Sequence, residues 1–312
     1  MDAKHPILVT GSHNSGTTWV GRNLALYNEV GYIHEPFNPG FRNPVVLGPK
    51  FDVFFTYISD HNEHLYLQGM KNALSFHYNL MANIFRKNNM RLPRRTAVAM
   101  KNWLYFYRYR SEDRFPLMKD PIALFSAEWL AKRFDMRVIV LIRHPAAFVN
   151  SIQSKGWRQP CYSLLSQKEL VADHLSPFRE ELEYYRGNKR PIVEEASFMW
   201  KLLYTQVAGY RERHPDWMFV RHEDLSLDPV EQFRGLFAYA GIHYTDEVIK
   251  GIKQRSGLLP ADPSKKTYAA IQRDSRANVT LWKQKLTPKE IELVRSNVQG
   301  VSELFYTDKD WE

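Results

Sequence analysis

Two hydrophobic patterns alternate along the chain. Short apolar runs occur at Ile7–Thr10, Ala97–Met100, Val138–Ile142 and Trp217–Val220. Their length is typical of buried strands in a parallel sheet. Between these runs, apolar residues return at helical spacing, as in Thr17–Asn28. The pattern therefore predicts strands that are separated by helices.

Helix-start signals support this alternation. Proline follows a capping residue at Asp120-Pro121, Asp228-Pro229 and Thr287-Pro288, which is the favoured order at a helix N-terminus. Glu231 and Glu290 add the acidic partner of a capping box to the last two. Further helices are expected from Pro145 and over Ile192–His214.

Strands that alternate with helices predict a parallel sheet covered on both faces. We therefore expect one α/β domain over residues 1–312, with a central parallel sheet flanked by helices. Two stretches fit this pattern poorly, at about 38–69 and 154–188. Long irregular stretches in compact domains are often lids or substrate walls, and we assign both to that role.

Composition narrows the class of partner. The 312 residues carry a formal net charge of +9, which favours anionic ligands. Cys161 is the one cysteine, so an internal disulfide and a cysteine-cluster metal site are excluded. No apolar run has the length of a membrane span, and the N-terminus has no signal-peptide pattern. From these features we expect a cytoplasmic protein.

Polar residues follow three of the predicted strands. Gly11–Thr18 has the spacing of a phosphate-binding loop, with Thr17 at the position of the usual lysine. Arg143 follows the Val138–Ile142 strand, Ser151 comes eight residues later, and His222 follows the last strand. Ligands bind beyond the carboxyl ends of such strands, so the sequence predicts an anion site there.

Several segments together resemble one known family. They read "HNSGTTW", "MKDP", "VLIRHPAAFVNSI", "FVRHEDLSLDP" and "RDSRANVTLWKQKLTPKE", in this order along most of the chain. The chain resembles sulfotransferases that use 3′-phosphoadenosine 5′-phosphosulfate (PAPS). The "MKDP" segment is similar to carbohydrate and tyrosylprotein types rather than to the cytosolic enzymes that act on small phenols.

The resemblance implies a binding set for PAPS and for its product adenosine 3′,5′-bisphosphate (PAP), without a metal. The loop residues Asn14, Ser15, Gly16, Thr17 and Thr18 would hold the 5′-phosphosulfate. Arg143 and Ser151 would bind the 3′-phosphate, and Ser275 and Arg276 are further candidates for it. His222 stands where the family usually has tyrosine. Trp19 would stack on adenine, and a core aromatic is the equal alternative.

The resemblance also implies the reaction, in-line transfer of a sulfuryl group to an acceptor hydroxyl or amine. Glu35 lies twenty residues after Ser15 and matches the base of the tyrosylprotein enzymes; His34 is the second choice. Lys119 would neutralise the bridging oxygen of the leaving group. A glycan or glycolipid is the expected acceptor. The aromatic stretches Phe51–Tyr57 and Trp103–Tyr109 are candidate sugar-stacking surfaces, and core packing is the equal alternative.

The family pattern departs at Asn14, where Arg or Lys normally precedes the serine. Loss of that cation puts activity in question unless a basic residue elsewhere replaces it, and Arg22 and Lys101 are the candidates. The expectation is that Asn14→Arg raises turnover if no replacement exists.

Two other classes of protein compete with this interpretation. A phosphate-loop kinase would need the loop lysine that Thr17 replaces. A nucleic-acid-binding protein is suggested by Asn102–Arg114, which interleaves aromatic residues with arginines, but no RNA-binding signature accompanies it. His61 and His64 lack an evident third metal ligand. We therefore expect neither nucleic acid nor metal.

Overall fold

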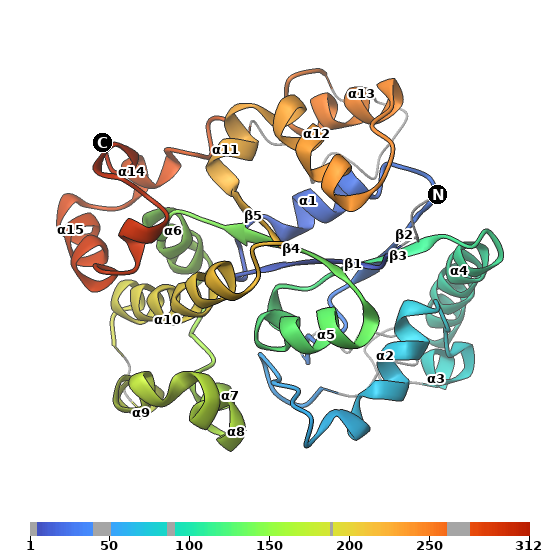
Figure 1. The fold of residues 1–312 in the computed structure, drawn as a ribbon, viewed down its shortest axis with the longest axis horizontal. Coiled ribbons are helices and arrows are strands. Elements are labelled where there is room, and N and C mark those ends of the chain that lie inside the picture. The colour runs from blue at the N-terminus through green and yellow to red at the C-terminus, as the bar shows by residue number, and fades with distance from the viewer. Residues whose placement is uncertain (1–4, 40–50, 86–90, 188–189, 261–274) are drawn as a thin grey trace.

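The computed structural model describes residues 5–39, 51–85, 91–187, 190–260 and 275–312. Its centre is a five-stranded parallel sheet in the order β2-β3-β1-β4-β5 (Figure 1). The strands are β1 (Ile7–Gly11), β2 (Val30–His34), β3 (Phe115–Lys119), β4 (Arg137–Ile142) and β5 (Met218–Arg221). All carboxyl ends therefore lie at one edge of the sheet, on either side of the central strand β1.

Helices connect the strands and surround the sheet. They are α1 (Thr17–Leu24), α2 (Leu67–Leu74), α3 (Leu80–Phe85), α4 (Leu92–Ser111), α5 (Ala127–Phe134), α6 (Pro145–Lys155), α7 (Cys161–Leu165), α8 (Lys168–Leu170), α9 (Arg179–Gly187), α10 (Ile192–Arg213), α11 (His222–Leu227), α12 (Pro229–Ala240), α13 (Asp246–Arg255), α14 (Leu281–Lys285) and α15 (Pro288–Asn297). Short 3₁₀ segments lie at Glu63–Leu65, Pro121–Ser126, Ser176–Phe178, Ser302–Leu304 and Asp308–Asp310, and a π-helical turn at Val171–Leu175. None of the described helices is long and apolar enough to cross a bilayer.

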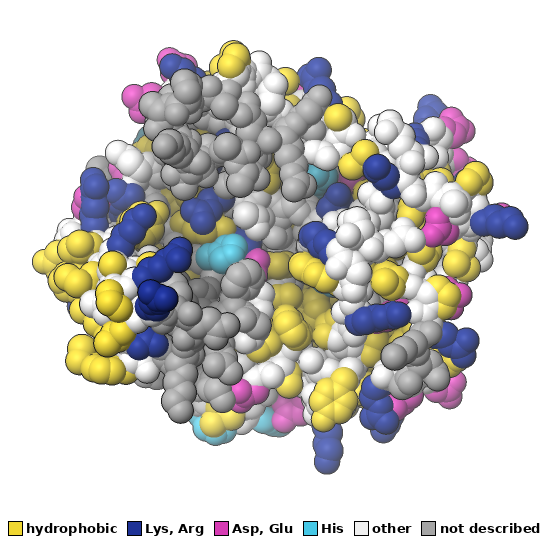
Figure 2. All heavy atoms as spheres, turned by 180° about the vertical axis from the view of Figure 1, so that it is seen from behind, with side chains coloured by type: hydrophobic (Ala, Val, Ile, Leu, Met, Phe, Trp, Pro, Cys, Tyr) yellow, Lys and Arg dark blue, Asp and Glu magenta, His cyan; other side chains and the backbone are white. Residues whose placement is uncertain are grey.

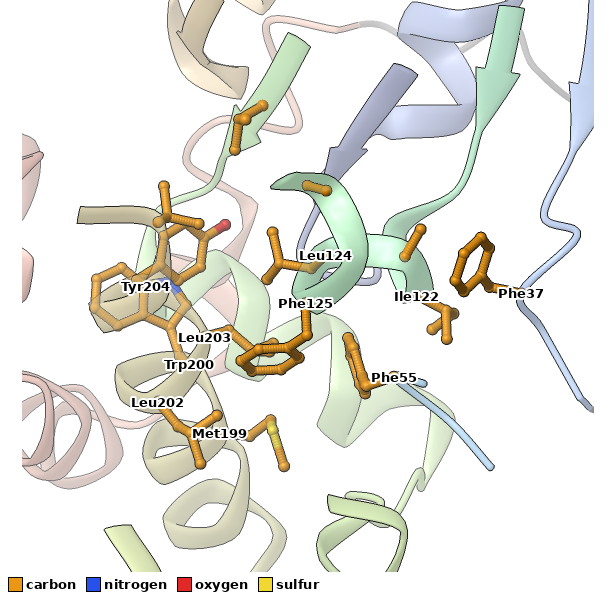
Figure 3. Close-up of a cluster of buried hydrophobic side chains, with 14 of the residues drawn as sticks. Phe37, Phe55, Ile122, Leu124, Phe125, Met199, Trp200, Leu202, Leu203 and Tyr204 are labelled. Carbon is orange, nitrogen blue, oxygen red and sulfur yellow. The ribbon is translucent and has the colours of Figure 1, made fainter. Parts of the chain in front are cut away.

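Alternate side chains of the strands enter two separate cores. On one face, strand residues such as Ile7 and Ile139 pack with α1, α12 and α13. On the other face, Leu8 and Val140 pack with α5, α6 and α10, and Figure 1 shows these two layers above and below the sheet. Figure 3 shows the second core, where Phe125 lies beside side chains of α10. This alternation is the period-2 geometry of strands that are buried on both faces.

The structure confirms the predicted fold class and most of its elements. The apolar runs at β1 and β4 are strands, and the last run forms β5 one residue later than predicted. Helix α1 ends at Leu24, four residues before the predicted end. The predicted caps exist at Asp228 and Thr287, whose side chains accept hydrogen bonds from Glu231 N and Glu290 N.

Two predictions about elements were wrong. Ala97–Met100 is not a strand but the middle of the 20-residue helix α4, because four apolar residues carry no period of their own and the flanking Leu, Lys and Arg favour helix. The region 154–188 is largely helical, with α7, α8 and α9, rather than irregular. Its role as a lid or substrate wall stays a prediction, as does that of 38–69.

Strands β2 and β3 were missed. Strand β2 contains Gly31 and ends in His34, while β3 contains Pro116 and ends in Lys119. Gly and Pro weaken a strand pattern, and Pro argues against a central strand. The two residues pair with each other across the strands.

Candidate functional site

A cavity of about 970 Å³ lies beyond the carboxyl ends of the strands. Residues that follow each of the five strands contribute to its wall, from the loop after β1 to His222 after β5. Eleven of the fourteen site residues that the sequence predicts line it: Asn14, Gly16, Thr17, Thr18, Trp19, His34, Glu35, Arg143, Ser151, His222 and Ser275. The parallel topology thus brings together side chains that are up to 261 positions apart in sequence.

The loop after β1 has the geometry of an anion cradle. Gly16 has φ +97°, and a Cβ at this position would lie 2.5 Å from Nδ1 of His222. The N-terminus of α1, which starts at Thr17, has no side-chain cap, so its first N–H groups suit a bound anion. Ser15 turns away, because its hydroxyl donates to the Ser12 carbonyl at 2.6 Å; it is buried and does not line the cavity.

Asn14 is held between two cations. Its carbonyl oxygen accepts a hydrogen bond from the Arg143 guanidinium, and its side-chain oxygen accepts one from the Lys155 ammonium. The Asn14 side-chain nitrogen is buried and has no hydrogen-bond partner among the described residues. Asn14 has φ +62°, a left-handed conformation that asparagine tolerates well.

Lys155 is one of the cavity residues that the sequence did not predict. It lies at the end of α6, twelve residues after Arg143, and its ammonium sits 4.5 Å from the centre of the Trp157 ring. No motif marks it, because its position depends on the length of α6. The two proposed replacements for the loop cation do not line the cavity: Arg22 stacks on Tyr32, and Lys101 lies exposed on α4.

The cavity wall is strongly cationic. Arg143, Lys155, Arg158 and Arg255 line it, whereas Glu35 is the one acidic residue among the described residues that do so. The Arg255 guanidinium is buried against the Arg22 carbonyl. A cavity with four cations and one carboxylate favours a multiply charged anion.

Glu35 and Lys119 form a partly buried ion pair at the ends of β2 and β3. The Lys119 ammonium donates to the Glu35 carboxylate, and its side chain is fully buried. The other carboxylate oxygen accepts from Asn38 at 2.8 Å. Glu35 has φ +44°, a conformation that is uncommon outside glycine and clusters at functional sites. Lys119 itself does not line the cavity, whereas Glu35 does.

The pair sets the charge of both groups. Burial alone raises the pKa of Glu35, but the Lys119 ammonium and the hydrogen bonds more than offset burial, so this pKa lies below its ordinary value. Burial lowers the pKa of Lys119 by more than Glu35 raises it. Glu35 is therefore ionised at neutral pH and can accept a proton.

His34 lies next to Glu35 and also lines the cavity. Burial, with the nearby Lys119 charge, lowers its pKa to about 4. Its Nδ1 lies 3.2 Å from the Tyr32 hydroxyl. A neutral imidazole and a carboxylate thus face the same space, and both candidate bases are in place.

His222 and Trp19 form the wall next to the loop. Burial lowers the pKa of His222 to about 3, and its Nδ1 has no hydrogen-bond partner among the described residues. The Trp19 ring contacts the rings of His222 and Phe233 edge-on, with distances between ring centres of 5.8 Å and 5.2 Å. Trp19 therefore packs on the core and also lines the cavity.

The remaining candidates differ in position. Ser275 lines the cavity and donates to the Ser226 carbonyl at 2.9 Å. Arg276 does not line it, and its Nε donates to the Leu227 carbonyl at 3.0 Å. In the part of the chain that the structure describes, no group of three His, Cys, Asp or Glu side chains is placed to hold a metal ion.

The fold and the cavity are those of an α/β protein with a phosphate-type loop and a cationic cavity at the sheet edge. Comparison with known proteins identifies its family. Residues 6–246 match the profile of the Sulfotransferase family. Because this match covers most of the chain, the protein belongs to the sulfotransferase family.

Curated relatives are similar to part of the chain, and a solved structure shares its fold. The chain is 28% identical to carbohydrate sulfotransferase 3 of Mus musculus over 61% of its length, and 25% identical to carbohydrate sulfotransferase 2 of Homo sapiens over 57%. It spans about a third of these relatives, 35% and 34%. The sulfotransferase domain from the curacin biosynthetic pathway shares the fold, with a TM-score of 0.51, 14% identity, and coverage of 98% of this chain and 99% of that one.

Proposed function

We propose that the protein transfers a sulfuryl group from PAPS to a hydroxyl of a carbohydrate-bearing acceptor. One observation carries the proposal: a single cavity is lined by the glycine loop, by Arg143 and Ser151, and by an ionised carboxylate, Glu35. These are an anion cradle, a second anion contact and a base, which together are what such a transfer requires.

The residues present fit PAPS. The cavity wall carries four cations, and buried polar atoms of Asn14 and His222 beside the loop have no hydrogen-bond partner among the described residues. The loop from Gly16 to Thr18 and Lys155 would hold the phosphosulfate, and Arg143 with Ser151 the 3′-phosphate. When bound, PAPS supplies an activated sulfuryl group with PAP as its leaving group.

Side chains of this chain would accept the proton, position the base and neutralise the leaving group. Glu35 accepts the proton of the acceptor hydroxyl, with His34 as the second candidate. Lys119 keeps this carboxylate ionised and in place, because its ammonium pairs with Glu35 and does not line the cavity. We therefore move the neutralising role from Lys119 to Lys155, the cation that contacts the loop.

A glycan or glycolipid is the proposed acceptor. The names of the relatives support a carbohydrate, and Phe54, Phe55 and Trp157 provide apolar walls on which a sugar ring can pack. The stretch Trp103–Tyr109 contributes no residue to the cavity. An acceptor screen with labelled PAPS tests this class. The cytoplasmic location stays a prediction.

Ligand binding to Arg143→Ala tests the proposed function. A charge-assisted contact contributes about 1.5–3 kcal/mol, so affinity for PAP should fall by about ten- to a hundredfold. Affinity for adenosine 5′-monophosphate, which lacks the 3′-phosphate, should change little. Arg234→Ala is the matched control, because this arginine is exposed on α12 and pairs with Glu231.

Isothermal titration calorimetry gives both affinities. Equal weakening for the two nucleotides would remove Arg143 from the 3′-phosphate. In a thermal-shift comparison of the unmodified protein, PAP should stabilise more than ATP with Mg²⁺. The reverse order would favour a kinase.

A further inference from the structure

Helix α4 is hydrophobic on its outer side as well as on its inner side. Ala99, Phe106 and Tyr109 are buried against the protein. On the adjoining side of the helix, Met100, Trp103, Leu104 and Tyr107 are 51%, 37%, 56% and 58% exposed. Their spacing of i, i+3, i+4 and i+7 places them in one stripe. A helix packed on a core does not need this second stripe.

The hydrophobic surface extends beyond this stripe. Leu92 of α4 and Met81 and Phe85 of the neighbouring α3 are also exposed. Figure 2 shows hydrophobic side chains gathered at its left edge, where α4 lies, with Lys and Arg side chains beside them. Large contiguous apolar surfaces of this kind mark interaction sites.

The charged residues within α4 all have one sign. Exposed cations are present at Arg94, Lys101, Arg108 and Arg110, and α4 contains no acidic residue. The first acid after the helix, Glu112, pairs with Arg108 and Arg114. Any partner of this surface must therefore accept apolar side chains and provide negative charge.

We propose that α4 docks on the surface of a lipid bilayer that contains anionic headgroups. A helix with an apolar stripe flanked by cations lies in the membrane interface, with the stripe toward the acyl chains and the cations toward the phosphates. Trp and Tyr suit this boundary because one end of each ring is polar. The 20 residues of α4 form a ridge of about 30 Å.

Two other partners fit the same surface less well. In a second copy of this chain, two α4 stripes would meet with their flanking cations facing each other, which is repulsive. A single-stranded nucleic acid stacks on aromatic rings, but it leaves the aliphatic side chains of Met100 and Leu104 without a partner. A bilayer accommodates both kinds of side chain.

This inference is independent of the proposed function. None of the residues of α4 lines the cavity, so vesicle binding and nucleotide binding can be measured on the same protein without interference.

Vesicle co-sedimentation tests the proposal. The protein should bind vesicles of phosphatidylcholine mixed with phosphatidylglycerol and bind much less to vesicles of phosphatidylcholine alone. The pair Leu104→Gln with Tyr107→Gln, and separately the pair Lys101→Glu with Arg110→Glu, should each lower the partition coefficient by about tenfold or more. All four residues are exposed, so the fold should survive, which circular dichroism checks.

Matched substitutions elsewhere provide the control. Leu304→Gln changes an equally exposed leucine, and Lys285→Glu with Lys289→Glu changes two exposed lysines outside α4. These variants should bind like the unmodified protein. The proposal is overturned by absence of binding to the anionic vesicles, or by an equal loss in the controls. It is also overturned if the α4 variants instead abolish oligonucleotide binding or dissociate a dimer in size-exclusion chromatography.

Discussion

At the scale of single residues, the Asn14 side chain in the loop and the Lys155 ammonium on α6 form one hydrogen-bonded contact. Asn14 has a left-handed backbone, which costs other non-glycine residues roughly 1 kcal/mol, and its side-chain oxygen contacts the Lys155 ammonium. We propose that Lys155 supplies from α6 the cation that the resemblance leads us to expect in the loop. No local pattern could predict this contact, because it depends on the conformation of one segment and the end of another.

Lys155→Ala should therefore lower turnover with PAPS by about ten- to a hundredfold, the equivalent of one charge-assisted contact of about 1.5–3 kcal/mol. Asn14→Arg alone should bring no gain, because Lys155 already supplies the charge and arginine disfavours this backbone. In the Lys155→Ala background, Asn14→Arg should restore part of the rate. Steady-state kinetics measures the turnover of these variants. Lys132→Ala, which changes an exposed lysine, is the control. A clear gain from Asn14→Arg alone would show that the unmodified site lacks a cation.

Glu35→Gln should keep the affinity for PAP and reduce turnover by about 10²–10⁴, the usual contribution of a general base. Calorimetry and kinetics on one preparation separate the two effects. Turnover within a few-fold of the unmodified enzyme would move the base to His34.

Lys119→Met tests the positioning role through a pH profile. Without the ammonium, only the Asn38 hydrogen bond and the nearby His34 would oppose burial, so the pKa of Glu35 should rise. The base would then be lost at a higher pH, so the acid limb of kcat/KM should move upward in the variant. An unmoved limb with a uniformly lower rate would contradict this role for Lys119.

At the scale of elements, the sequence predicts strands that have a clear local pattern and does not predict strands that depend on tertiary pairing. The apolar runs of β1 and β4 were evident, because both are buried on both faces. Strands β2 and β3 were not evident, because Gly31 and Pro116 weaken their patterns. Only tertiary pairing, of β3 with β1 and of β2 with β3, makes them strands. Most of the site residues predicted from the sequence do line the cavity, and many of them follow strand ends directly. Lys155, Arg158 and Arg255 could not be predicted, because they come from helices or loops without a motif.

The loop between β1 and α1 should depend on Gly16. Alanine there would strain a backbone at φ +97° and bring its Cβ to 2.5 Å from His222, so Gly16→Ala should weaken PAP binding by about tenfold or more. Gly300→Ala is the matched control, because it has φ +84° and no atoms within 4 Å of the added Cβ. This control should lose some stability and no affinity. Equal PAP affinity in both variants would contradict a close-fitting loop.

At the scale of the whole molecule, aromatic residues of the C-terminal segment pack around one histidine near the end of the sheet. His144 follows β4, stacks on Trp282 at 4.9 Å and contacts the rings of Tyr306 and Trp311. Burial lowers its pKa to about 3, and neither ring nitrogen has a hydrogen-bond partner among the described residues. The segment therefore packs on a neutral imidazole.

This burial couples stability to pH. The unfolded chain binds a proton at His144 below about pH 6.5, whereas the folded chain does so only near pH 3. Stability is thus unaffected above pH 6.5 and is lost as pH falls from 6.5 toward 3. At pH 5 the loss is at most about 2 kcal/mol, or 1.5 pH units at 1.36 kcal/mol each.

His144→Phe keeps a ring against Trp282 and removes the proton site. We compare the free energy of unfolding of this variant with that of the unmodified protein. The difference between them should shift in favour of the variant by up to about 2 kcal/mol between pH 7 and pH 5, whatever its value at pH 7. Urea unfolding at the two pH values measures this change, with His243→Gln, a substitution of an exposed histidine, as the control. If the stability of the unmodified protein and of His144→Phe falls equally between pH 7 and pH 5, His144 is protonated in the folded state. The C-terminal segment then does not exclude water from it.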